Sequence, residues 1–138
     1  MSNIDRPSVG IIGLGIMGGL MAKTLIENGF KVFGRDIEPA CNQRLRRAGG
    51  QVLKSNALVA VHADVLMISV ASSAALSSVM SDLAQTPRPA KAQIVIDTST
   101  LPLTDKMAAA RELKRQGRIL LDCPISGTAN QMQDRAWT

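Results

Sequence analysis

The sequence predicts a doubly wound α/β fold, in which helices cover both faces of a parallel sheet. Short apolar runs alternate with longer stretches of helical spacing along the chain, which is typical of consecutive β-α-β units with right-handed crossovers. A glycine-rich turn at 13–18 follows the first apolar run and opens the first helical stretch. The length of 138 residues and the 46% hydrophobic content suit one globular domain.

The first half of the chain carries clear signals for where elements begin and end. Gly29 ends the first helical stretch, and Pro39 suits the first turn of the second. Gly49 and Gly50 end that second helix, and Ser55 is expected to cap the third. We expect strands at 8–13, 31–36 and 51–53 and helices at 16–28, 39–48 and 56–61.

The second half continues the alternation. The uninterrupted apolar run at 65–70 predicts a strand buried on both faces. Ser72 or Ser73 is expected to cap the next helix, and two prolines mark a loop at 86–90. Pro102 suits the first turn of the last helix. We expect strands at 65–70, 93–97 and 118–122 and helices at 72–85 and 101–116.

Composition excludes several classes of protein. No stretch approaches the ~20 apolar residues of a membrane span, and the polar residues 1–7 do not form a secretory signal. Cys41 and Cys123 lie far apart and form no metal spacing, so we expect reduced thiols, no metal and a cytoplasmic protein. The net charge of +5 is spread along the chain and only 2% of residues are aromatic. This argues against a basic nucleic-acid arm and a base-stacking platform and also suits a small anionic ligand, but composition alone does not choose between these partners.

The segment Gly13-Leu14-Gly15-Ile16-Met17-Gly18 has the G-x-G-x-x-G form of a dinucleotide-binding turn. The first glycine permits a tight turn, the second lets a pyrophosphate approach the backbone, and the third permits close packing of the helix. The free N–H groups at the helix start then face the phosphates. A P-loop is excluded because Gly19 and Leu20 follow, where that motif needs Lys and Ser or Thr. The fold predicted is therefore of the Rossmann dinucleotide-binding type.

Asp36 lies 18 residues after Gly18, close to the spacing of the ribose-binding acid in this fold. A carboxylate there binds the adenosine ribose hydroxyls and repels a 2′-phosphate, which favours NAD over NADP. The neighbouring Arg35 could hold such a phosphate, so NADP stays open. A second interpretation makes Asp36 a turn residue that caps the following helix. A methyltransferase that binds S-adenosylmethionine also uses a glycine turn and a strand-end acid, but usually lacks the full glycine pattern.

From Val9 onward the chain resembles the β-hydroxyacid dehydrogenase family, which includes 3-hydroxyisobutyrate, 6-phosphogluconate and tartronate semialdehyde enzymes. Val9 to Gly18 resembles the family's cofactor signature, including Met17 within the turn. The resemblance implies that the loop after the run 65–70, with Val70 and Ala71, contacts the cofactor. It also implies that Thr100, in Asp97-Thr98-Ser99-Thr100, lies beside the nicotinamide. A second interpretation makes Ser99 or Thr100 a cap of the next helix.

Asp122-Cys123-Pro124-Ile125-Ser126-Gly127 resembles the family's substrate motif. The resemblance implies that Ser126 and Gly127 bind a substrate carboxylate, together with Thr128, which stands where the family usually has a second glycine. Without the resemblance this segment is an ordinary turn.

The resemblance also implies elements that this sequence does not contain. The family's general acid–base lysine lies downstream of the serine–glycine motif, and we expect it beyond Thr138. We therefore expect 1–138 to be a dinucleotide-binding domain of a truncated chain that lacks a C-terminal helical domain. The parent protein would be an NAD-dependent, homo-oligomeric 3-hydroxyacid dehydrogenase, and the chain alone would only bind cofactor. The alternative is a non-catalytic dinucleotide-binding or regulatory module.

Overall fold

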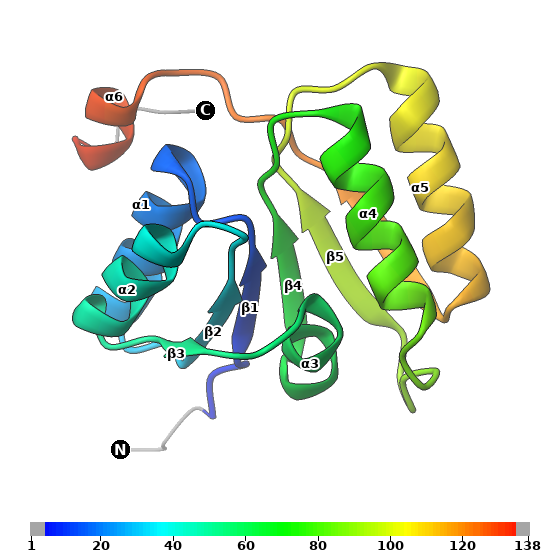
Figure 1. Ribbon diagram of the computed structural model, residues 1–138, viewed down its shortest axis with the longest axis horizontal. Helices are drawn as coiled ribbons and strands as arrows, with labels where there is room; N and C mark the ends of the chain where they lie inside the picture. Colours follow the sequence, from blue (N-terminus) through cyan, green and yellow to red (C-terminus); the bar gives the residue numbers. More distant parts are fainter. Residues whose placement is uncertain (1–4, 135–138) are drawn as a thin grey trace.

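The computed structural model describes residues 5–134 and is built on a parallel sheet with the strand order β3-β2-β1-β4-β5-β6. The chain first builds outward from the central strand β1 to β3, and then returns to add β4, β5 and β6 on the other side (Figure 1). The order therefore reverses between β1 and β4, where α/β sheets of this topology bind their ligands. The strands are β1 (Val9–Ile12), β2 (Val32–Arg35), β3 (Gln51–Val52), β4 (Val65–Ile68), β5 (Gln93–Asp97) and β6 (Arg118–Asp122).

The helices follow the predicted alternation, with differences at their ends. Ser55 and Ser72 cap their helices, because each side chain accepts a hydrogen bond from the backbone N–H of the residue three positions later. Pro102 precedes its helix as the N-cap instead of lying in the first turn. A short helix after β6 was not predicted. The helices are α1 (Ile16–Glu27), α2 (Pro39–Ala48), α3 (Asn56–His62), α4 (Ser73–Ala84), α5 (Leu103–Arg115) and α6 (Ala129–Gln133).

Two apolar cores lie on opposite faces of the sheet. Helices α3, α4 and α5 cover one face and bury Ile12, Leu66 and Val95. Helices α1 and α2 cover the other and bury Ile11 and Val32. The predicted arrangement with helices on both faces is thus confirmed, and β1 and β2 each place buried residues in both cores.

The face under α1 and α2 is covered unevenly. Ile119 and Leu121 of β6 are 49% and 44% exposed, and they belong to neither core. The expectation that the run 65–70 is buried on both faces is wrong, because Val65 and Met67 are only half-buried. The reason is topological: α1 and α2 follow β1 and β2 and lie over the half of the sheet that those strands build.

The two edges of the sheet are chemically different. At the amino edge, buried Arg118 donates hydrogen bonds to neutral oxygens of Gln93, Gln116 and Thr86. The polar atoms of these side chains are thus paired with one another. At the carboxyl edge, towards the top of Figure 1, the loops lead into helices and one chain segment crosses from β6 to α6 beside α1. Among residues 5–134, no helix is both long enough and apolar enough to span a bilayer.

Candidate functional site

The glycine turn between β1 and α1 is shaped by two contacts that exclude side chains. Gly13 has φ +92°, and a Cβ on it would lie 1.9 Å from the backbone oxygen of Ser69, just after β4. A Cβ on Gly18 would lie 2.0 Å from the backbone oxygen of Gly13. Both positions therefore require glycine. The tight turn at Gly13 agrees with the sequence prediction. The close packing of the helix at Gly18 is against the backbone of the turn, at Gly13.

Gly15 has the opposite environment. A Cβ there would have no heavy atom within 4 Å, and its φ of −66° suits any residue. Gly15 is the N-cap of α1, and no side chain caps the helix. The N–H groups of the first turn are therefore available to an anion, which the positive end of the helix dipole also favours. Ile16 is 73% exposed, while the Leu14 side chain is buried in the core.

Asp36 ties the glycine turn to the end of β2. Its Oδ2 accepts a hydrogen bond from the N–H of Leu14 at 2.7 Å, and its Oδ1 accepts one from the N–H of Glu38 at 2.8 Å. Asp36 thus has the turn part of its second interpretation, but α2 begins at the N-cap Glu38 without a side-chain cap. Each carboxylate oxygen has a second lone pair, so Asp36 can still accept hydrogen bonds from a ligand.

Sequence reasoning missed the residue that orients Asp36. Buried Asn42 of α2 accepts from the N–H of Asp36 at 2.9 Å and donates to its carbonyl at 2.8 Å. The sequence signal that could have found it is an asparagine, Asn42, in the helix that begins just after the strand-end acid Asp36.

The loops after β4 and β5 are joined by a buried hydroxyl. Ser99 Oγ accepts a hydrogen bond from the N–H of Val70 at 2.9 Å. Ala71 and Thr100 are exposed on the same edge, where a ligand could reach them. The capping interpretation of Ser99 and Thr100 is wrong, because α5 starts later, at Leu103, and has no side-chain cap.

The loop after β6 is exposed and ends in a local motif. Ser126, Gly127 and Thr128 are all exposed, and Gly127 has φ +138°. The Thr128 N–H donates to Gln131 Oε1 at 2.7 Å, and Thr128 Oγ1 accepts from the Gln131 N–H at 3.2 Å. This reciprocal pair is a capping box, which starts α6 and could have been read from the spacing Thr-x-x-Gln. The Thr128 N–H is thereby occupied, which leaves the groups of Ser126 and Gly127 for an anion.

Lys106 of α5 is a further polar residue at this edge that sequence reasoning missed. It is 4% exposed, and its Nζ lies 2.9 Å from Asp97 Oδ2 and 2.8 Å from Asp122 Oδ1. It also donates to the carbonyl of Ser99 at 2.6 Å. Burial by itself lowers the pKa of Lys106, but the hydrogen bonds and charges of Asp122 and Asp97 outweigh it and raise the pKa above 10.5.

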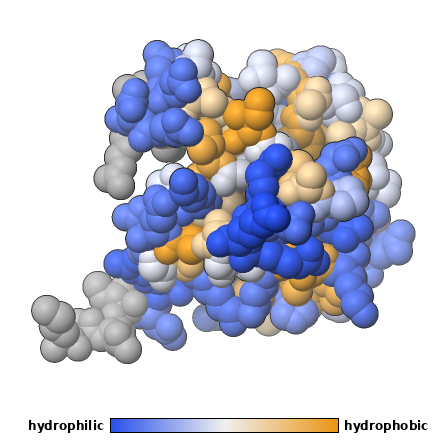
Figure 2. All heavy atoms as spheres, turned by 60° about the vertical axis from the view of Figure 1, so that its left-hand side comes forward, coloured by the Kyte–Doolittle hydropathy of each residue, from blue (hydrophilic) through white to orange (hydrophobic). Residues whose placement is uncertain are grey.

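Two hollows adjoin the glycine turn and β2. One, of about 350 Å³, lies between α1, α2 and α6 and is mainly apolar, with Gly15, Lys23 and Arg44 among its lining residues. Figure 2 shows exposed apolar surface between hydrophilic regions on the side of the molecule where these helices lie. The other, also about 350 Å³, is lined in part by Arg35 and Lys54. Both could accommodate parts of a ligand that extends from the turn.

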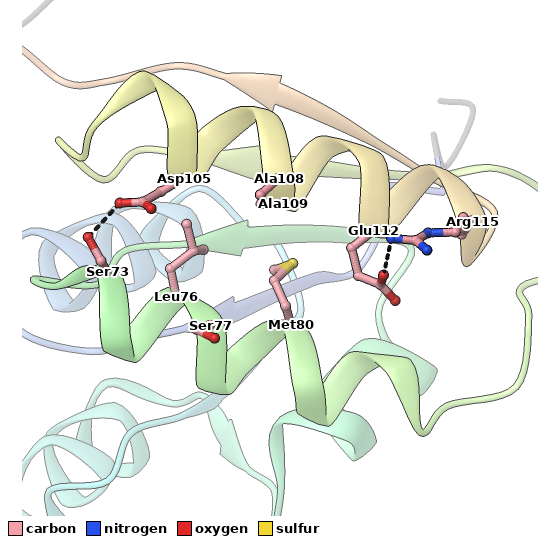
Figure 3. Close-up of a pocket in the computed structure, with 9 residues that line it drawn as sticks. All are labelled: Ser73, Leu76, Ser77, Met80, Asp105, Ala108, Ala109, Glu112 and Arg115. Atoms are coloured by element: carbon pink, nitrogen blue, oxygen red, sulfur yellow. Dashed lines mark hydrogen bonds and ion pairs between the residues drawn. The ribbon is translucent and has the colours of Figure 1, made fainter.

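A third hollow, of about 340 Å³, is a groove between α4 and α5 on the outer side of the molecule (Figure 3). Four of its polar side chains are paired: Ser73 with Asp105, and Glu112 with Arg115. This groove is a seam between packed helices rather than part of the site at the strand ends.

Residues 8–136 match the family described as the NAD binding domain of 6-phosphogluconate dehydrogenase. The chain belongs to this family. This NAD-binding domain is 34% identical over 127 residues to mitochondrial 3-hydroxyisobutyrate dehydrogenase of Rattus norvegicus, covering 91% of the chain and 38% of the relative. It is also 34% identical over 125 residues to L-threonate dehydrogenase of Cupriavidus necator, covering 88% and 41%.

A solved structure agrees with this assignment. Mycobacterium tuberculosis 3-hydroxyisobutyrate dehydrogenase, determined with L-serine, superposes with a TM-score of 0.88 at 26% identity, covering 96% of this chain and 45% of that chain. The NAD-binding domain thus spans about two fifths of the length of these curated relatives and just under half of the solved structure.

The two contrasting glycines of the NAD-binding domain give a direct test of the turn. Gly18→Ala forces a methyl group against the Gly13 carbonyl and should lower the free energy of unfolding by about 1–3 kcal/mol or more. Gly15→Ala places its methyl group in open space and should cost less, about 1 kcal/mol or less, which is the preference for glycine over alanine at an N-cap. Urea titration of both variants checks this, and equal destabilisation would contradict the geometry.

The raised pKa of Lys106 predicts a pH dependence of stability. The folded domain binds this proton more tightly than the unfolded chain, so the stabilisation is complete below the ordinary pKa of 10.5 and is lost as pH rises through the raised value. We expect the free energy of unfolding to fall at alkaline pH in the natural chain. Lys106→Arg should show a smaller fall, because a guanidinium stays protonated.

The sequence contains no tyrosine, which removes one common source of alkaline titration. Parallel urea titrations at increasing pH give the comparison. Identical pH profiles for the two proteins would show that Lys106 makes no contribution of this kind.

Proposed function

We propose that this NAD-binding domain holds NAD across the carboxyl edge of its sheet. The pyrophosphate lies on the turn formed by Gly13, Gly15 and Gly18, with Leu14, Ile16 and Met17 completing it. Asp36 binds the adenosine ribose, and Val70, Ala71 and Thr100 line the nicotinamide side. The observation that carries the proposal is the open space over Gly15 at the uncapped start of α1, since a helix N-terminus without a side-chain cap favours a phosphate.

The proposal includes a preference for NAD over NADP. Asp36 is fixed by two backbone N–H groups and by Asn42, so it cannot easily move away from a 2′-phosphate. Two like charges in contact disfavour binding. The competing feature is the hollow lined by Arg35 and Lys54, whose cations could hold a 2′-phosphate.

We further propose that the domain belongs to an oxidoreductase that transfers a hydride between NAD and a small 3-hydroxy acid. In support, relatives of this chain are named 3-hydroxyisobutyrate and L-threonate dehydrogenases, and a related solved structure was determined with L-serine. Ser126 and Gly127 would bind the substrate carboxylate, with Thr128 shaping the loop. Residues 1–138 would be one domain of a longer, homo-oligomeric protein whose helical second domain supplies the general acid–base lysine.

The alternative function is a dinucleotide-binding or regulatory module without chemistry. The position of Lys106 favours a purely binding role for residues 5–134 taken alone, because its ammonium is held by two carboxylates and is 4% exposed. In either case we propose no nucleic-acid or membrane partner. The free thiols of Cys41 and Cys123 fit the reducing cytoplasm, although several relatives are named as mitochondrial.

Calorimetric titration tests the binding site. The natural chain should bind NAD more tightly than NADP by about tenfold, a difference of about 1.4 kcal/mol, and should not bind S-adenosylmethionine. Asp36→Asn removes the charge and should narrow the NAD preference, while Glu38→Gln, an exposed acid two residues away, should leave it unchanged. Equal changes in both variants would refute the role of Asp36, and binding of S-adenosylmethionine alone would refute the proposed function.

Catalysis is tested separately with the chain of 138 residues. We expect no 3-hydroxyisobutyrate- or L-serine-dependent formation of NADH, because a positioned general acid or base contributes about 10²–10⁴-fold to such reactions and the buried Lys106 ammonium cannot act as one. Clear substrate-dependent NADH formation by the purified chain would overturn this prediction.

A further inference from the structure

Lys106 occupies an unusual position for a lysine. Lys106 lies on α5, in the outer layer of the molecule, and its ammonium reaches the carboxyl edge of the sheet. The whole residue is only 4% exposed. A buried ammonium is costly unless it is paired and hydrogen-bonded. Here it has the two carboxylates and the carbonyl oxygen described above, so its three donors face three oxygen atoms.

The two acids it contacts are neighbours across the sheet. Asp97 and Asp122 are register partners at the ends of β5 and β6, and like charges opposite each other on adjacent strands repel. Asp97 is completely buried, and among the described residues its Oδ2 has no hydrogen bond, only the ion pair with Lys106 at 2.9 Å. The ammonium is therefore what allows both strands to end in an acid at this point.

Each group that Lys106 touches also holds a loop of the proposed site. Lys106 donates to the carbonyl of Ser99, and the hydroxyl of Ser99 accepts a hydrogen bond from the N–H of Val70. Asp97 orients the Ser99 N–H through its Oδ1 and accepts the Cys123 N–H through its carbonyl. Asp122 is the last residue of β6, directly before the loop with Ser126. One ammonium thus joins the loops after β4, β5 and β6.

We propose that Lys106 is a positioning residue that couples the nicotinamide side of the cofactor site to the substrate loop. This inference rests on the proposed function. It assigns Lys106 no contact with ligand; the residue acts through Ser99, Asp97 and Asp122. The sites proposed for the pyrophosphate and the adenosine ribose, on the β1 and β2 side of the sheet, are outside its reach and do not depend on it.

A comparison of two ligands separates positioning from simple stabilisation. ADP-ribose contains the adenosine, pyrophosphate and ribose parts of NAD but no nicotinamide. In the natural chain NAD should bind more tightly than ADP-ribose. Lys106→Met, an uncharged side chain of similar length, should reduce this preference by about tenfold, as expected for the loss of an interaction with a charged group. Its affinity for ADP-ribose should stay within about twofold, because distant sites are nearly independent.

Two further variants serve as controls. Lys106→Arg keeps the charge and should restore part of the preference, and Lys114→Met, on an exposed position of the same helix, should leave it intact. An unchanged preference in Lys106→Met would overturn the proposal. A parallel loss of affinity for both ligands would also overturn it, because that result indicates a general structural role.

A milder variant covers the case in which Lys106→Met does not fold. Asp122 has a side chain that is 44% exposed, so Asp122→Asn keeps the Lys106–Asp97 pair and should fold. It should speed amide hydrogen exchange at Cys123 while leaving Leu14 of the glycine turn unchanged, and unchanged exchange at Cys123 would contradict the coupling. If the natural chain binds neither ligand, the proposed function fails. If it binds NAD and ADP-ribose equally tightly, only the inference about Lys106 fails.

Discussion

The close approach of the glycine turn to the end of β4 is the constraint on which the site depends. The backbone oxygen of Ser69 occupies the space where a Gly13 side chain would be, and the Gly13 oxygen occupies the corresponding space at Gly18. β1, α1 and β4 are thereby held together by backbone contacts, which rotamer changes cannot relax. The position of the Leu14 N–H follows from this packing, and with it the position of Asp36.

On the other half of the sheet, polar side chains fix the positions of the loops, as backbone contacts do at the glycine turn. The hydroxyl of Ser99 and the ammonium of Lys106 fix the loops that follow the strands of this half. A buried ion pair is weak evidence for net stability, because desolvation offsets much of the attraction. Its geometric effect is clearer, since it defines where two strand ends and the loop between them must lie. Backbone contacts thus hold the side proposed for the phosphates, and a charge cluster holds the side proposed for the nicotinamide.

The order of the elements and the glycine turn could be predicted from the sequence because both are local. Helical spacing, Pro39 and Gly29 act within a few residues, and the same holds for Gly13 to Gly18. The contacts of Lys106 could not be predicted, since they join residues of one helix to two strands that become neighbours only in the sheet. The half-covered strand β4 was missed for the same reason. An apolar run does not tell how far the helices extend over the sheet, whereas the capping box before α6 was local and could have been recognised.

The strand order has a consequence for how the chain folds. β1 pairs with β2 nearby in sequence, but its other neighbour is β4, in which Val65 lies opposite Val9. Non-local pairing of this kind is slow, because the intervening chain must be ordered before the contact forms. During synthesis, the Ser69 carbonyl that closes the glycine turn emerges only after β2, α2, β3 and α3. The turn near the start of the chain therefore reaches its final geometry only after the middle of the chain has folded.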